Sequence, residues 1–263
     1  MAIITLKNVT FIRNQKKILE NINWTVQKNE HWVIMGRNGS GKSNLIKLIM
    51  AENWKTSGEI TVLGTRFGQD RIPELRAKIG IVGSFIAERF RPDIVSENLV
   101  LTGKYNSSML YKAFSEDDLA VARELMKQIG AGELIGRIYG TLSQGEKQLL
   151  LIARSLMIKP EILILDEATN GLDLFAKSRL LTQLHQITQL ADAPTLIYIT
   201  HHPDEITDDF QKLLFLRDGK VVNSGTPAQL LTADSLTDFY QEPVQIEVVD
   251  GHHFVLPQKS NLI

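Results

Sequence analysis

The stretch WVIMGRNGSGKSNLIKLIM, residues 32–50, decides the fold of this chain. It opens with four apolar residues, Trp32–Met35, whose unbroken hydrophobicity is typical of a strand buried on both faces. It closes with residues 42–50, where apolar side chains recur at helical spacing. Between them, residues 36–43 fit the pattern G-x-x-x-x-G-K-[ST]. A strand, a glycine-rich turn and a helix in this order predict a loop that wraps a phosphate group.

The chemistry of phosphate binding explains the residue types in this loop. Glycines let successive backbone N–H groups curl around phosphate oxygens, and the following helix directs its positive end at the same anion. We expect Lys42 to reach the β- and γ-phosphates of ATP and the Ser43 hydroxyl to bind Mg²⁺. An ordinary glycine-rich turn is the alternative, which the flanking strand and helix disfavour. The expected nucleotide-binding residues are Gly36, Arg37, Asn38, Gly39, Ser40, Gly41, Lys42, Ser43 and Asn44.

Two acidic residues, Asp166 and Glu167, end a second apolar strand that begins at Ile162. A parallel strand delivers its last residues to the carboxyl edge of its sheet, where phosphate loops also lie. We therefore expect Asp166 to hold Mg²⁺ through water, opposite Ser43, and Glu167 to act as the general base on the attacking water. Taken alone, the pair would be a solvated strand end; the phosphate loop upstream favours the catalytic interpretation.

The order of the remaining segments predicts an α/β core with a helical insertion. Together with the family resemblance described below, it implies a P-loop NTPase core with a mostly parallel sheet, an N-terminal antiparallel β-subdomain and an inserted α-helical subdomain. The ATPase domain is expected over residues 1–243, with its core at about 1–84 and 156–243 and the helical subdomain at about 85–155. A tail, 244–263, is expected to form a short hairpin around Asp250-Gly251. The expected strands are 3–10, 22–26, 32–35, 59–62, 79–82, 162–166, 195–200, 213–216 and 221–224, and the expected helices include 42–50, 115–129 and 175–191.

The composition narrows the classes of function. With 29 basic and 30 acidic residues the formal net charge is −1, so the chain has no overall attraction to nucleic acid, and no nucleic-acid partner is expected. Cysteine is absent, which excludes disulfides and thiolate metal sites. The N-terminus lacks a secretory pattern, and no apolar run approaches the about 20 residues that cross a bilayer. A role in transport would therefore require a membrane-spanning partner.

Residues 142–146, LSQGE, resemble the signature of ATP-binding-cassette (ABC) ATPases, usually written LSGGQ. Ser143 is placed as a helix N-cap, with Glu146 completing a capping box, and Gly145 leaves the backbone bare for a close approach to phosphate. Residues 170–173 resemble the D-loop of this family, with Asp173 as its acid, and His201 resembles its switch histidine. The resemblance extends over about residues 3–235.

The resemblance to ABC ATPases implies a reaction and partners. It implies hydrolysis of ATP with Mg²⁺ by a homodimer, in which Ser143 and Gly145 of one copy close over the phosphate loop of the other, and in which Lys42, Glu167 and His201 are catalytic. It also implies an integral membrane permease as partner, with the chain in the cytoplasm or at the inner face of the cell membrane. Two alternatives stay open at this point: a soluble ABC ATPase acting on a cytosolic protein, and a nucleotide-gated binding module with little hydrolysis.

The chain departs from the family pattern at two positions. Ser84 stands where the family has the Q-loop glutamine, and we expect at most a weak, water-mediated contact from it to Mg²⁺. Arg13 aligns with the family's adenine-stacking aromatic, and Phe11, two residues earlier, is the alternative. Features such as Asn23-Trp24 resemble a stand-alone bacterial branch associated with molybdate transport. The pair His252-His253 is expected to be solvated rather than metal-binding.

Overall fold

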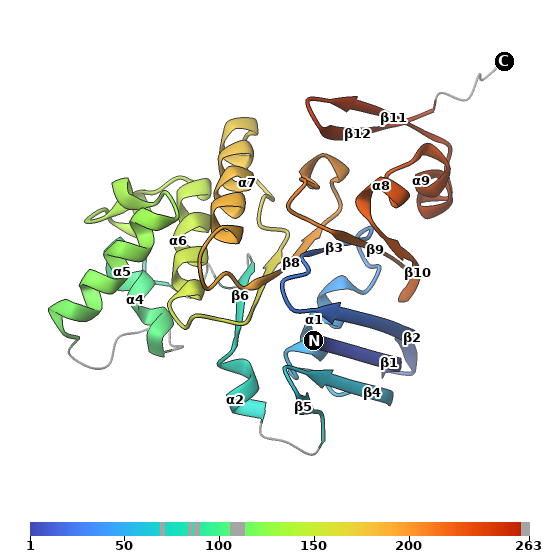
Figure 1. Ribbon diagram of the computed structural model, residues 1–263, viewed down its shortest axis with the longest axis horizontal. Coiled ribbons are helices and arrows are strands. Elements are labelled where there is room, and N and C mark those ends of the chain that lie inside the picture. Colours follow the sequence, from blue (N-terminus) through green and yellow to red (C-terminus); the bar gives the residue numbers. More distant parts are fainter. Residues whose placement is uncertain (69–71, 84–85, 87–89, 106–113, 259–263) are drawn as a thin grey trace. The chain divides into compact units, whose positions relative to one another are not determined.

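The computed structural model describes residues 1–68, 72–83, 86, 90–105 and 114–258 (Figure 1). The chain forms two compact units, each described here by itself. The first consists of Met1–Leu75 and Ile197–Ile263, and the second of Arg76–Leu196. The second unit therefore contains the expected helical segment, a strand that precedes it in the sequence, and a strand and a helix that follow it.

The first unit begins with an antiparallel sheet of four strands in the order β2-β1-β4-β5, which confirms the expected N-terminal β-subdomain. β1 and β2 pair from Ala2↔Gln27 to Arg13↔Lys16, so both extend beyond the apolar cores that predicted them. The reason is the two-residue turn at Asn14 and Gln15, whose φ angles of 50° and 62° suit a tight hairpin and allow pairing through polar residues. The four strands are β1 (Ala2–Arg13), β2 (Lys16–Gln27), β4 (Ser57–Val62) and β5 (Thr65–Arg66).

The phosphate-loop stretch belongs to parallel strands of the same unit. All four residues of β3 (Trp32–Met35) are buried, and β3 pairs in parallel with β8 (Thr195–Thr200) and with β9 (Lys212–Arg217). Burial on both sides explains why β3 has no polar residue. β10 (Lys220–Gly225) lies antiparallel to β9, and α1 (Lys42–Ile49) follows β3 through the glycine-rich loop.

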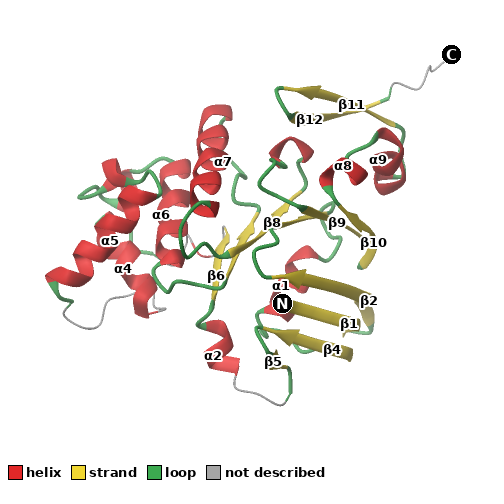
Figure 2. Ribbon diagram, in the orientation of Figure 1, coloured by secondary structure: helices red, strands yellow, loops and turns green. Residues whose placement is uncertain are grey.

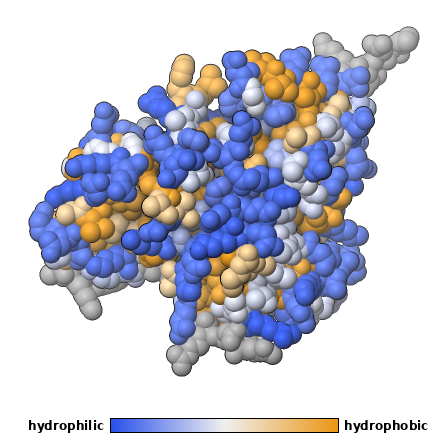
Figure 3. All heavy atoms as spheres, viewed as in Figure 1, coloured by the Kyte–Doolittle hydropathy of each residue, from blue (hydrophilic) through white to orange (hydrophobic). Residues whose placement is uncertain are grey.

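The C-terminal part of the first unit consists of two short helices and a hairpin. The hairpin strands, β11 (Val244–Val249) and β12 (His252–Pro257), pair antiparallel around Asp250 and Gly251, which both have positive φ. Figure 3 shows a hydrophobic area over these strands. The exposed large apolar side chains of the hairpin are Val248, Val249, Phe254 and Leu256. The preceding helices are α8 (Pro227–Leu230) and α9 (Ala233–Tyr240).

The second unit pairs β6 (Ile79–Gly83) in parallel with β7 (Ile162–Asp166) and also contains several helices (Figure 2). α4 (Ser96–Leu101) packs against α5 (Glu116–Gln128) and α6 (Gln144–Leu156). The expected capping box at Ser143, the start of α6, is present, and α5 begins with a capping box at Ser115. Short helical segments complete the unit, namely η1 (Thr102–Tyr105), η2 (Gly132–Leu134) and η3 (Tyr139–Thr141), and α2 (Ile72–Arg76) spans the boundary between the units.

α7 (Leu174–Thr188) ends earlier than the sequence predicts. The N–H of Gln189 bonds to Gln186 O and that of Leu190 to Ile187 O, so the helix tightens into three-residue turns before the expected end at 191. No helix among the described residues is long and apolar enough to span a bilayer.

Candidate nucleotide site

The loop at residues 36–43 requires glycine at two places. A Cβ on Gly36 would lie 2.4 Å from Ser40 Oγ and 2.7 Å from Leu216 O, so no side chain fits there. Gly41 has a φ of +107°, and a Cβ on it would lie 2.8 Å from Leu19 Cδ2. The loop therefore takes its curled path because these two positions carry no side chain.

Lys42 is enclosed by the loop that precedes it. Its side chain is buried, and Nζ donates to Gly36 O at 2.7 Å and to Arg37 O at 3.3 Å. The ammonium group thus lies inside the turn that the pattern assigns to phosphate. Ser43, the second residue of α1, is exposed and carries the hydroxyl expected to bind Mg²⁺.

The geometry of the loop fits a phosphate group on three observations. α1 is capped by Gly41 without a side-chain hydrogen bond, so no cap side chain occupies the N–H groups of its first turn. The Ser40 hydroxyl is buried and has no hydrogen-bond partner among the described residues. The buried Lys42 supplies positive charge beside both features. An anion with several acceptor oxygens would satisfy all three.

His201 follows β8 on a turn that a buried carboxylate holds. Glu205 is only 1% exposed, and its Oε2 accepts hydrogen bonds from Tyr198 Oη at 2.8 Å and Thr200 Oγ1 at 2.5 Å. Thr200 Oγ1 in turn accepts from the N–H of His202 at 2.9 Å, and the rings of His201 and His202 lie 4.0 Å apart. Glu205 was not predicted from the sequence, where the only signal for it is an acid four residues after His201.

The two candidates for adenine stacking differ in exposure. Phe11 is 7% exposed and belongs to the hydrophobic core, so its ring is not presented at the surface. Arg13 is exposed at the end of β1, opposite Lys16. Of the two, Arg13 alone is accessible to a ligand.

The acids of the second unit lie where β7 ends. The strand is buried through Leu165 and becomes half-buried at Asp166. Glu167 has a φ of +50°, and its Oε2 accepts a hydrogen bond from Asn170 Nδ2 at 2.6 Å. Non-glycine residues in this left-handed region are often found at functional sites, because the surrounding structure must hold them there.

The signature residues form the start of α6. Ser143 Oγ accepts from the N–H of Glu146 at 3.3 Å, and Glu146 Oε2 accepts from the N–H of Ser143 at 2.7 Å. A Cβ on Gly145 would lie 3.1 Å from the Cβ of Ala176 in α7. Gly145 therefore packs tightly against α7 within its own unit, a contact that the sequence alone did not indicate. Asp173 caps α7, its Oδ1 accepting from the N–H of Ala176 at 2.9 Å.

The structure thus places the expected residues in two groups. Residues 36–44, Arg13 and His201 belong to the first unit, and Ser143, Gly145, Asp166 and Glu167 to the second. Ser84 lies outside the described residues. No cluster of three or more potential metal-ligating side chains (His, Cys, Asp or Glu) occurs in the described parts of the chain, so the His252-His253 pair has no such cluster around it. His252 Nδ1 instead lies 2.9 Å from the backbone oxygen of Asp204.

A buried parallel strand, a curled glycine loop around a buried lysine, and a helix behind it define a P-loop nucleotide-binding protein. Comparison with known proteins specifies the family: residues 19–170 match the family described as ABC transporter. The chain therefore belongs to the family of ABC transporter ATP-binding proteins, which bind and hydrolyse ATP.

Relatives extend over the whole length of the chain. It is 64% identical over 257 residues to an uncharacterized ABC transporter ATP-binding protein, YmeB, of Lactococcus lactis, covering 98% of this chain and 99% of that one. A putative ABC transporter ATP-binding protein of Streptococcus mutans is 56% identical, covering 98% and 100%. The molybdenum import ATP-binding protein ModC of Haemophilus ducreyi is 34% identical, covering 82% of this chain and 59% of ModC.

Two solved structures are similar in fold and sequence. CbiO1 from Clostridium perfringens, part of the ABC transporter complex cbiONQ, has a TM-score of 0.75 at 26% identity, covering 90% of this chain and 93% of CbiO1. The dimeric bacterial ABC transporter cassette MJ0796 has a TM-score of 0.71 at 25% identity, covering 85% and 98%. The α/β fold expected from the sequence is confirmed.

Proposed function

We propose that this chain hydrolyses MgATP as one of two identical cassettes that drive a membrane permease. The observation that carries the proposal is the phosphate loop, with Lys42 buried against Gly36 O and the Ser40 hydroxyl buried beside it without a partner among the described residues. Family membership supports the same reaction, because ABC transporter ATP-binding proteins hydrolyse ATP.

Each expected residue has a role in this proposal. Residues 36–44 hold the phosphates, with Lys42 on the β- and γ-phosphates, and Arg13 stacks on adenine. Ser43 supplies a hydroxyl oxygen, a hard donor that Mg²⁺ prefers, and Asp166 holds the ion through water. Glu167 takes a proton from the attacking water as the terminal phosphate–oxygen bond of ATP breaks, which yields ADP and phosphate, and His201 contacts the γ-phosphate. Ser84 contributes at most a water-mediated contact.

The proposal also includes a dimer and a permease partner. Ser143 and Gly145 of one copy would complete the site of the other, which excludes bulk water and adds a positive helix start. The dimeric cassette MJ0796 and the membership of CbiO1 in a transporter complex support this arrangement. A permease partner would place the chain at the cytoplasmic face of the membrane. The similarity to ModC makes molybdate a first cargo to test.

Titration with a fluorescent ATP analogue tests the carrying observation. Lys42→Ala is expected to lower the affinity for MgATP at least about tenfold, because a charge-assisted contact is worth about 1.5–3 kcal/mol. Lys47→Ala is the matched control, since Lys47 is exposed on the same helix. Unchanged affinity in a folded Lys42→Ala variant would show that nucleotide binds elsewhere.

A further inference from the structure

The first turn of the signature helix carries a carboxylate, Glu146, where the proposed function requires an anion to approach. Glu146 is half-buried, and its Oε2 is engaged by the N–H of Ser143 at 2.7 Å. Although partial desolvation opposes it, the hydrogen bonds from Ser143 and from Arg137 hold the pKa of Glu146 below its ordinary value. Glu146 is therefore ionised at neutral pH. Its negative charge lies one residue from Gly145 and would repel the γ-phosphate of a nucleotide held by a second copy.

Arg137 neutralises this carboxylate. Its Nη1 donates to Glu146 Oε1 at 2.5 Å, while the other oxygen, Oε2, caps the helix. The two oxygens of Glu146 thus serve different partners, one outside α6 and one inside its capping box. The capping box alone would leave the full negative charge at the helix start.

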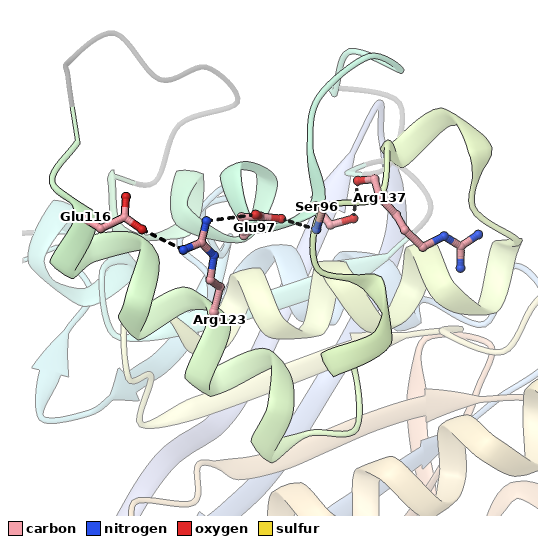
Figure 4. A network of polar contacts seen from close by, with 6 residues as sticks. Ser96, Glu97, Glu116, Arg123 and Arg137 are labelled. Atoms are coloured by element: carbon pink, nitrogen blue, oxygen red, sulfur yellow. Dashed lines mark hydrogen bonds and ion pairs between the residues drawn. The ribbon is translucent and has the colours of Figure 1, made fainter.

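The backbone around Arg137 is anchored on both sides. Arg137 O accepts from the N–H and the Oγ of Ser96, both at 2.9 Å, and the N–H of Gly136 donates to Glu97 Oε2 at 2.8 Å. Glu97 is itself buried and receives Arg123 Nη2 at 3.4 Å. Figure 4 shows this network, with the guanidinium of Arg137 turned away from it. The Arg137 side chain, which pairs with Glu146, therefore extends from a backbone segment that hydrogen bonds hold in place.

Fold stability does not explain the pair. The side chains of Arg137 and Glu146 are 43% and 31% exposed, and ion pairs at that exposure contribute little to the free energy of unfolding. The segment is already held by Ser96 and Glu97, and α6 already has its cap. We therefore attribute to the Arg137–Glu146 pair a role in the electrostatics at the start of α6.

We propose that Arg137 is a positioning residue of the signature: by pairing with Glu146, it makes the start of α6 able to accept the γ-phosphate of MgATP bound to a second copy of this chain. The inference rests on the proposed function, and it goes beyond it by assigning a role to a residue outside the signature. It predicts that Arg137 matters only while position 146 carries a negative charge.

A double-mutant cycle tests this dependence. MgATP hydrolysis is measured over a range of ATP concentrations for the parent chain, Arg137→Ala, Glu146→Gln and the double variant. Arg137→Ala should lower kcat/KM at least about tenfold in the parent and less than about twofold in the Glu146→Gln background. Arg137→Lys, which keeps the charge, should lose much less than Arg137→Ala. Arg91→Ala is the control, because Arg91 forms an exposed ion pair with Asp93.

Three outcomes would overturn the inference about Arg137, and one of them would also overturn the proposed function. Equal losses from Arg137→Ala with and without Glu146→Gln would mean that Arg137 acts independently of the carboxylate, and would overturn the inference. An active parent with an unaffected Arg137→Ala variant would overturn it as well. A parent chain without MgATP-dependent turnover would overturn the proposed function and the inference together. Thermal melting of each variant identifies any loss that comes from unfolding.

Discussion

At the scale of single residues, Glu167, the proposed general base, lies in an unusual backbone conformation. Its φ of +50° is costly for a glutamate, and the bond from Asn170 Nδ2 to its Oε2 holds the carboxylate in place. Asn170 begins the segment that resembles the D-loop.

Glu167→Gln separates binding from hydrolysis in the proposed mechanism. We expect the variant to bind MgATP but to hydrolyse it about 100-fold more slowly or worse, because a positioned general base contributes about 10²–10⁴-fold. A dimer should then accumulate, and size-exclusion chromatography with MgATP should show a doubled mass. Glu161→Gln, an exposed acid just before the same strand, is the control. A Glu167→Gln variant with the parent's turnover would remove Glu167 from the role of base.

Glu205 is expected to affect both the stability of the fold and the turnover of ATP. Glu205→Ala leaves the hydroxyls of Tyr198 and Thr200 without their shared acceptor in the interior, which costs about 1–3 kcal/mol of unfolding free energy. Thr200 Oγ1 also accepts a hydrogen bond from the N–H of His202, which is next to His201, the residue proposed to contact the γ-phosphate. We therefore expect Glu205→Ala to lower kcat more than the affinity for ATP. Denaturant titration and steady-state kinetics measure the two effects. Tyr198→Phe removes only one of the two donors, so its unfolding free energy should lie between those of the parent and Glu205→Ala. Equal unfolding free energies for the parent and the two variants would contradict this account.

At the scale of elements, the start of α6 combines a cap with a proposed contact to a second copy. Ser143 Oγ is the acceptor that completes the capping box, and Gly145 packs closely on Ala176 of α7. A substitution at Gly145 would therefore disturb the packing of α6 against α7 whatever else it did. Ser143 is the better position for testing the contact.

A pair of substitutions at Ser143 keeps the cap and changes only the charge. Aspartate and asparagine cap helices about as well as serine does. We expect Ser143→Asp to lower the MgATP-dependent turnover at least about tenfold, or about 1.4 kcal/mol, because it places a negative charge against the phosphate. Ser143→Asn should lose far less. Equal losses in the two variants would point to the geometry of the cap rather than to phosphate contact.

At the scale of the whole molecule, the proposed site needs two chains, and mixing variants tests this. In a heterodimer of Lys42→Ala with Ser143→Asp, one site has both defects and the other has neither. With independent sites, an equal mixture should recover about a quarter of the parent's ATPase activity, since about half of the dimers are mixed and each has one intact site. A mixture no more active than either variant alone would count against the two-chain site.

The local sequence by itself determined several elements of the fold and the phosphate loop of the site. Strand β3, the glycine loop and helix α1 could be predicted because an apolar run, fixed glycine spacing and helical periodicity are properties of neighbouring residues. The capping boxes at Ser115 and Ser143 were predictable for the same reason, since each joins residues three apart. The resemblance to ABC ATPases also rests on such short motifs.

What only the tertiary structure decided involves residues far apart in the chain. Phe11 is a core residue because residues from other elements bury it, and Gly145 lies close to Ala176 because α7 packs against α6. Arg137 meets Glu146 because hydrogen bonds to Ser96 and Glu97 fix the segment that carries it. A local pattern carries no record of such approaches, because they arise only when separate elements pack together.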